Sequence, residues 1–244
     1  MIRWTVSLAI VLASTIGAGA ASMGQEVEPP WQKAASPSVA AVANWVVGSG
    51  DNRGLPFLIV DKAAADVAVF DAKGDFRGEA PALLGMARGD VVDADIGDRP
   101  LSTITPSERI TQAGRFFAQF GSSEGMSDVL WIDFGTSLSL HPVVTSNPNE
   151  RRPERLDSVS SDDNRITFGC VNVSEQFYRS IVKSVFADGV GIVYIVPEID
   201  KLGSVFPKIE TYAEAAARTT SGASSAELTQ ADEAIRPVSR TPGM

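Results

Sequence analysis

Short apolar segments separated by turn residues constrain the fold of this chain most. Each segment has strand length, and most are rich in β-branched or aromatic residues. Clear helical spacing of apolar side chains occurs in one stretch, residues 175–186, for which Ser174 is a plausible N-cap. These patterns predict a mostly β fold, a sandwich or barrel with one helix packed beside it. The strands are expected at residues 55–61, 68–71, 77–84, 114–120, 130–134, 138–141 and 191–197.

The N-terminus has the pattern of a signal peptide. Arg3 supplies a short positive start, residues 5–18 are small or apolar and uncharged, and Ala18-Gly19-Ala20 fits the cleavage rule. We therefore expect residues 1–20 to be removed on export to the periplasm or cell envelope. The rest of the chain offers no apolar run of transmembrane length, so no integral membrane segment is expected after cleavage.

Composition divides the remaining chain. Residues 21–53 are rich in Pro, Ala, Ser and Gly and are expected to lead into the domain, with a short helix around residues 38–47. The strand pattern places one folded domain at residues 54–199. Residues 200–244 contain mainly small and polar residues after about Tyr212, so this C-terminal extension is expected to be largely disordered.

The chain has one cysteine and one histidine, and a formal net charge of −9. It cannot form an internal disulfide, and a Cys/His zinc site needs more ligands than it contains. The aspartate-rich segment 90–98 lacks the order of a calcium loop. We therefore expect no metal and no cofactor, and the acidic charge argues against nucleic-acid binding.

Cys170 and His141 are the candidate reactive pair. Cys170 is expected just before the helix that Ser174 begins, where the helix dipole and free N–H groups would favour the thiolate. Gly169 would leave the sulfur uncovered. His141 ends an expected strand, so it could act as the base if the fold joins the two. The alternative is a buried, inert cysteine and a hydrogen-bonded histidine without a reactive role.

The segment Thr167-Phe168-Gly169-Cys170-Val171-Asn172, preceded by His141, resembles the signature of the L,D-transpeptidase (YkuD-like) catalytic domain. Residues 111–116, the hairpin at 55–85 and the closing Gly191–Pro197 strand are also similar to that family, so the resemblance covers residues 54–199. The sequence departs from the family at Phe168, where a second histidine is usual, and at Gln112, where proline is usual. The segment between His141 and Cys170 is also longer than usual.

The resemblance implies an L,D-transpeptidase-like domain that forms peptidoglycan cross-links. His141 would take the proton of Cys170, and the thiolate would attack a stem tetrapeptide and release D-alanine. An amine of a second stem would then resolve the thioester. The implied catalytic residues are Cys170, His141 and Gly169; the implied substrate-binding residues are Thr167, Asn172, Arg165 and Phe168. Peptidoglycan stem peptides would be the partners of a protein that we expect to be monomeric.

Two alternatives stay open. A stem-peptide hydrolase (an L,D-carboxypeptidase or amidase) would use the same Cys–His site with water or another acceptor. A non-catalytic wall-binding module is kept open by Phe168. A papain-type protease does not fit, because its cysteine precedes its histidine. In the polar loop 142–164, Arg151, Arg152 and Arg155 could bind carboxylates, but we expect a solvated loop. Arg165 is the stronger candidate for that role.

Overall fold

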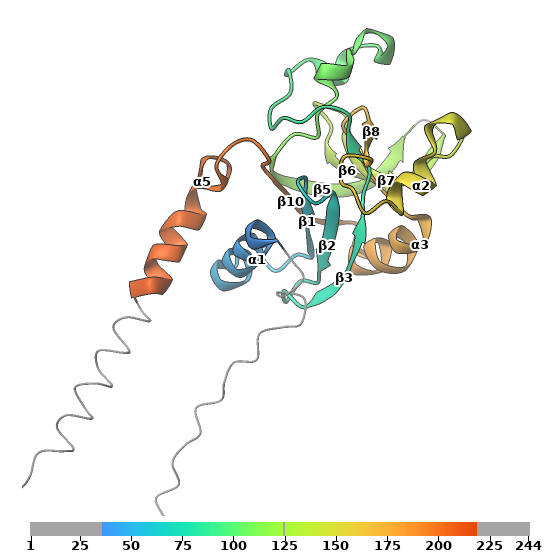
Figure 1. Ribbon diagram of the computed structural model, residues 1–244. Coiled ribbons are helices and arrows are strands. Elements are labelled where there is room, and N and C mark those ends of the chain that lie inside the picture. The colour runs from blue at the N-terminus through green and yellow to red at the C-terminus, as the bar shows by residue number, and fades with distance from the viewer. Residues whose placement is uncertain (1–35, 124, 219–244) are drawn as a thin grey trace, which may run out of the picture.

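The computed structural model describes residues 36–123 and 125–218. The expected signal peptide and the last part of the extension, residues 219–244, lie outside this range. Figure 1 shows a curved sheet with helices packed around it, a mostly β fold as the sequence predicts. The strands are β1 Phe57–Asp61, β2 Asp66–Phe70, β3 Phe76–Pro81, β4 Leu84–Gly85, β5 Gly114–Ser123, β6 Met126–Asp133, β7 Leu138–Pro142, β8 Arg165–Thr167, β9 Val171–Val173 and β10 Val190–Val196.

The two longest uninterrupted helices are the first helix and residues 207–218. Helix α1 spans Pro37–Ser49, and the helix after β9 is divided into α3 Glu175–Phe177, a π-helical turn Tyr178–Val182 and α4 Lys183–Val185. Residues 207–218 are also helical. The remaining segments are α2 Arg152–Leu156, α5 Leu202–Val205 and the 3₁₀ turns Ile96–Asp98, Leu101–Thr103, Pro106–Glu108 and Pro148–Glu150. Within the described residues, no helix is long and apolar enough to cross a membrane.

The eight-stranded sheet has the order β3-β2-β1-β10-β5-β6-β7-β9. Its neighbours are antiparallel except for the pairs β1–β10 and β7–β9, which are parallel. The outer edge of β9 does not face solvent. Instead Asn172 forms a bridge with Leu83, with backbone hydrogen bonds of 2.7 and 2.9 Å in both directions. The segment after β3 thereby pairs with the opposite edge of the sheet and nearly closes it into a barrel.

Both faces of the central strands are buried, which explains their uninterrupted apolar sequences. Leu58 and Val60 of β1 belong to the core between sheet and the α3–α4 helix, whereas Phe57 and Ile59 point to the opposite face. That second face is covered by α1 and by the segment that follows β10. Because side chains alternate along a strand, one strand contributes residues to two separate apolar clusters.

The predicted helix near residues 38–47 is confirmed as α1. Its N-terminus is capped by Ser36, whose Oγ accepts from the Val39 N–H at 3.3 Å, and its C-terminus by Gly50 in the left-handed conformation at φ 69°. The buried face of α1 includes Trp45, which packs edge-on against Tyr194 of β10 at 5.8 Å between ring centroids. The helix is thus part of the same packed unit as the sheet.

The first part of the C-terminal extension is helical, at residues 202–205 and 207–218. Phe206 and Ile209 are 2% and 7% exposed in the cluster around Trp45 and Tyr194. The expectation of disorder concerns mainly the residues after about Tyr212. The segment has few large apolar residues, but they meet a surface of the sheet that would otherwise be bare. Burial against that surface, rather than composition, decides its structure.

The surroundings of Cys170 also differ from the expectation. Strand β9 lies between Cys170 and the helix, whose N-cap is Ser174 as predicted, with its Oγ accepting from the Phe177 N–H at 3.2 Å. An extended strand rises about 3.3 Å per residue, so the helix start lies on the order of 13 Å beyond Cys170 along the chain. The helix dipole therefore does not activate this thiol.

We predict that Phe206→Ala lowers the free energy of unfolding by about 3 kcal/mol, because it leaves a cavity between α1 and β10. Urea unfolding of the full chain measures this change. The control is Ile199→Ala, at a side chain that is 68% exposed, which should change stability by less than about 0.5 kcal/mol. Equal effects of the two substitutions would contradict the packing of this segment on the sheet.

Candidate active site

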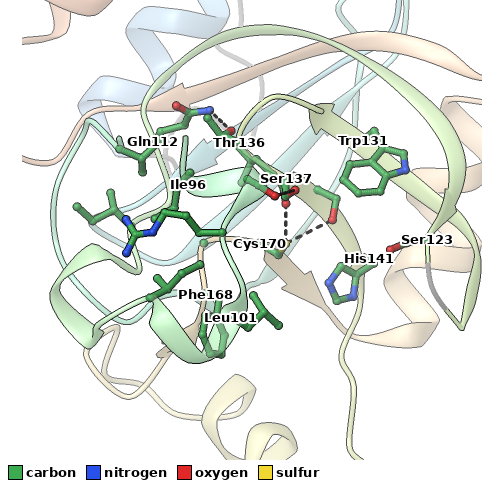
Figure 2. Close-up of a pocket in the computed structure, with 18 of the residues that line it drawn as sticks. Ile96, Leu101, Gln112, Ser123, Trp131, Thr136, Ser137, His141, Phe168 and Cys170 are labelled. Atoms are coloured by element: carbon green, nitrogen blue, oxygen red, sulfur yellow. Dashed lines mark hydrogen bonds between the residues drawn. The ribbon is translucent and has the colours of Figure 1, made fainter. Parts of the chain in front are cut away.

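The candidate active site is a cavity of about 690 Å³ that contains both Cys170 and His141 in its lining. Figure 2 shows the two side chains on the cavity wall together with Phe168, Trp131 and Leu101. Part of the wall is contributed by the irregular segment between β4 and β5, which supplies apolar residues from Val92 to Ile110. The cavity is thus bounded by the sheet on one side and by a long loop on the other.

Strand pairing places His141 beside the segment that follows Cys170. Strands β7 and β9 are parallel, with Leu140 opposite Val171 and His141 opposite Asn172. Leu140 and Val171 point into the apolar core. Alternation then puts Ser139, His141 and Asn172 on the other face, the face that adjoins the cavity.

Cys170 is half-buried and contacts β7 and the turn before it. Its Sγ lies 3.4 Å from Ser139 Oγ, and the thiol donates to the carbonyl oxygen of Ser137 at 3.5 Å (Figure 2). Cys170 Sγ thus lies between the Ser139 hydroxyl and the turn that precedes β7.

His141 is 8% exposed, and both of its ring nitrogens are occupied. Nδ1 lies 2.8 Å from the carbonyl oxygen of Pro142, which can only accept, so Nδ1 carries the proton. Nε2 therefore accepts from Asn172 Nδ2 at 3.0 Å. Burial lowers the pKa of His141 below 6.5; the Pro142 bond opposes this shift, and the positive charge of Arg152 adds to it. The imidazole is thus neutral at neutral pH.

The turn before Cys170 is held by threonine hydroxyls. Thr167 Oγ1 donates to the Cys170 carbonyl oxygen at 2.7 Å and accepts from the Gly169 N–H at 3.1 Å. The hydroxyl of Thr111 donates to the Gly169 carbonyl oxygen at 2.7 Å. Gly169 has φ 139°, and an added Cβ would lie 2.8 Å from the Ile110 carbonyl oxygen. These contacts make the position of Cys170 depend on a glycine at 169.

Phe168 forms part of the cavity wall. The guanidinium carbon of Arg109 lies 3.8 Å from the centroid of its ring, and Arg109 also donates to the Ile104 carbonyl oxygen at 3.2 Å. The cation–π contact ties the loop to the segment before Cys170. An aromatic ring at this position contributes no hydrogen-bond donor to the cavity, unlike the histidine that is usual in the resembling family.

Three predicted substrate-binding residues do not reach the cavity wall. Thr167 and Asn172 are buried, and their polar atoms are engaged in the hydrogen bonds described above. Arg165 is 9% exposed and pairs with Glu198 at 2.7 Å, within a buried cluster that also includes Lys62 and Asp90. In the structure the Arg165 guanidinium joins β8 to Glu198, which follows β10, and does not line the cavity. Only Phe168 of that predicted set lines the cavity.

Several residues of the site were missed or underrated from the sequence. Ser139 is two positions before His141 in the same strand, so the two-residue period could have placed both on one face. Arg152 was expected to be solvated, yet its Nη1 donates to Asn172 Oδ1 at 2.9 Å. No local pattern indicates this contact, because it joins a loop to a strand distant in sequence. Within the described residues, no group of three or more His, Cys, Asp or Glu side chains could hold a metal ion.

No family model and no curated protein matches the chain. Among solved structures, the L,D-transpeptidase LdtMt1 in complex with imipenem is similar over 58% of this chain and 58% of its own, with 14% identity and a TM-score of 0.34. The chain thus matches less than two thirds of that protein. The catalytic domain of the Enterococcus faecium L,D-transpeptidase is similar over 57% of this chain and 95% of its own, with 16% identity and a TM-score of 0.33.

The helical cell shape determining protein Pgp2 from Campylobacter jejuni, solved as its K307A mutant, is also similar. The match covers 69% of this chain and 58% of that one, with 10% identity and a TM-score of 0.40. Because these TM-scores and identities are low, the function is argued from the residues of the site and not from these similarities.

We predict that Gly169→Ala destabilises the protein by at least about 2 kcal/mol, because it combines a strained φ with a backbone clash. Gly54→Ala is the matched control, since Gly54 has φ 71° and nothing within 4 Å of an added Cβ. It should cost about 1 kcal/mol, for the strained φ alone. Chemical unfolding compares the two; equal losses would show that the turn tolerates a side chain at 169.

We predict that the pKa of His141 lies below 6.5, and that the neutral ring carries its proton on Nδ1. Since the chain has one histidine, NMR of histidine-labelled protein reports on this residue alone. The unfolded chain takes up the proton first, so His141 makes the folded state less stable as the pH falls below about 6.5. A midpoint at or above 6.5 would contradict the buried, neutral ring.

Proposed function

We propose that this protein is a peptidoglycan L,D-transpeptidase that works by cysteine acyl transfer. The observation that carries the proposal is that the single cysteine and the single histidine of the chain line one cavity, His141 from strand β7 and Cys170 from the position just before the adjoining strand β9. These residues are far apart in the sequence, and a Cys–His nucleophile pair needs the fold to join them. The resemblance of residues 167–172 to the family signature supplies the substrate class.

The proposed reaction begins with transfer of the Cys170 proton to His141 Nε2. The Asn172 N–H must first release that nitrogen. The thiolate then attacks the carbonyl carbon of the diaminopimelate residue in a stem tetrapeptide, the C–N bond to D-alanine breaks, and the leaving amine takes the proton from His141. A thioester on Cys170 results. The amine of a second stem then attacks this thioester and loses a proton to His141. The bond to sulfur breaks as the cross-link forms, and His141 returns the proton to the Cys170 thiolate.

The cavity suits a peptide segment in size and lining. Its volume falls within the roughly 300–1,000 Å³ of typical ligand pockets. Leu101, Ile104 and Ile110 offer apolar contacts along the loop side, while Gln112 and Arg99 contribute polar groups. Arg99 is already paired with Glu108 at 2.8 Å. A stem-peptide carboxylate would therefore have to compete with that carboxylate for Arg99.

A non-catalytic wall-binding module is the second candidate. Its support is that the Cys170 thiol and His141 Nε2 each bond to another group, to Ser137 and Asn172, and not to each other. Such a module would use the cavity and not the thiol. Export to the periplasm or cell envelope and a monomeric state stay predictions under either function.

We predict that the mature protein converts disaccharide-tetrapeptide into a cross-linked dimer with loss of D-alanine, as measured by mass spectrometry. Cys170→Ala and His141→Ala should each lower the rate by at least about a thousandfold, because they remove the nucleophile and its base. Val159→Ala, at a fully exposed position of the 142–164 loop, serves as the control and should retain the rate.

Each other outcome has a distinct meaning. D-alanine loss without dimer would identify a hydrolase that uses the same site. Product formation that survives in Cys170→Ala would exclude cysteine acyl transfer. Binding of the muropeptide without any Cys170-dependent product would favour the wall-binding module.

A further inference from the structure

The 142–164 loop is hydrogen-bonded to the candidate base through one arginine. Arg152 begins helix α2, and its side chain is mostly buried. Its Nε donates to Glu150 within the loop, and its Nη1 donates to Asn172 Oδ1 at 2.9 Å. A planar guanidinium can make both bonds at once in fixed directions. Arg152 thereby joins the loop to strand β9.

This contact determines how the Asn172 amide is oriented. A cationic donor must face the amide oxygen, so the amide nitrogen points to the other side, toward His141 Nε2 at 3.0 Å. The hydrogen bond from Asn172 occupies the one lone pair of Nε2. If Nε2 gained a proton, two donors would face each other. The amide orientation therefore opposes formation of the imidazolium.

We propose that Arg152 is a positioning residue that acts through Asn172 to keep His141 neutral with Nε2 occupied. Release of Arg152 would let the Asn172 amide turn, so that its oxygen accepts from a protonated Nε2. The 142–164 loop would then control when the base can receive the Cys170 proton. This last consequence rests on the proposed function, whereas the state of His141 does not.

The other charged groups around His141 act in the opposite sense or are already paired. Asp128 and Glu175 line a hollow of about 310 Å³ on the side of His141 toward Val143. Asp128 pairs with Lys183 at 2.9 Å and Glu175 with Arg179 at 2.8 Å. Cys170 lies on the cavity side, where its Sγ contacts Ser139 and Ser137. The carboxylates would favour an imidazolium, whereas burial and the positive charge of Arg152 both oppose it.

The test is NMR titration of His141 in the full chain, which needs no substrate and reports on one histidine. In Arg152→Gln we expect the midpoint to rise by about one pH unit, with a change in the Nε2 nitrogen shift that marks the lost hydrogen bond. Arg151→Gln is the matched control, because the neighbouring Arg151 side chain is exposed and carries the same charge. Its titration should coincide with that of the unaltered protein.

A second pair of variants tests the route through Asn172. In an Asn172→Ala background, Arg152→Gln should lose most of its effect on the midpoint. Arg152→Lys retains the charge without the planar fork and should shift the midpoint in the same direction by less, which provides a test if the glutamine variant folds poorly. An unchanged midpoint in Arg152→Gln, or equal shifts in Arg151→Gln and Arg152→Gln, would overturn the proposal. The outcome of this titration does not depend on the outcome of the transpeptidase assay, so failure of the one can be distinguished from failure of the other.

Discussion

The parallel pairing of β7 with β9 is the interaction on which the site depends. It brings His141 opposite Asn172 and Cys170 beside Ser139, although the two strands are separated by a long polar loop. A strand at the edge of a sheet would be poorly fixed, but β9 also bonds to Leu83 on its other side. Because both edges are paired, a three-residue strand can hold side chains at defined positions.

The rest of the domain supports this pairing in two ways. The two apolar clusters on either face of β1 and β10 make the centre of the sheet rigid. A buried ionic cluster then fixes the loop that forms the far wall of the cavity. Lys62 donates to the carboxylate of Asp90 and to the Thr111 carbonyl oxygen at 2.9 Å, so both ends of that loop are bound to one ammonium group. Charges buried in this way are costly unless every partner is present, which favours a single arrangement.

The two candidate reactive groups are bonded to other partners and not to each other. Cys170 Sγ faces the Ser137 carbonyl oxygen, and His141 is neutral with Nε2 facing an amide donor. Acyl transfer requires His141 Nε2 to be released from Asn172 so that it can take a proton, whereas simple binding in the cavity does not require this change. The orientation of one amide, that of Asn172, decides whether this change occurs, because the amide can oppose or accept the imidazolium according to which end faces the ring. Helix activation of the thiol plays no part, since β9 intervenes.

The sequence by itself determined most of the local structure. The longer strands, helix α1, the Ser174 cap and the candidacy of Cys170 and His141 follow from period, capping chemistry and the rarity of these two residue types, whereas the short strands β4, β8 and β9 do not. The tertiary structure alone decided which residues meet. It placed Ser139 in the cavity wall and Arg152 on Asn172, paired Arg165 with Glu198 in a buried cluster, and packed Phe206 and Ile209 against the sheet. The physical reason is range. Backbone preferences act between near neighbours, whereas burial and ion pairing depend on partners that only the folded chain brings together.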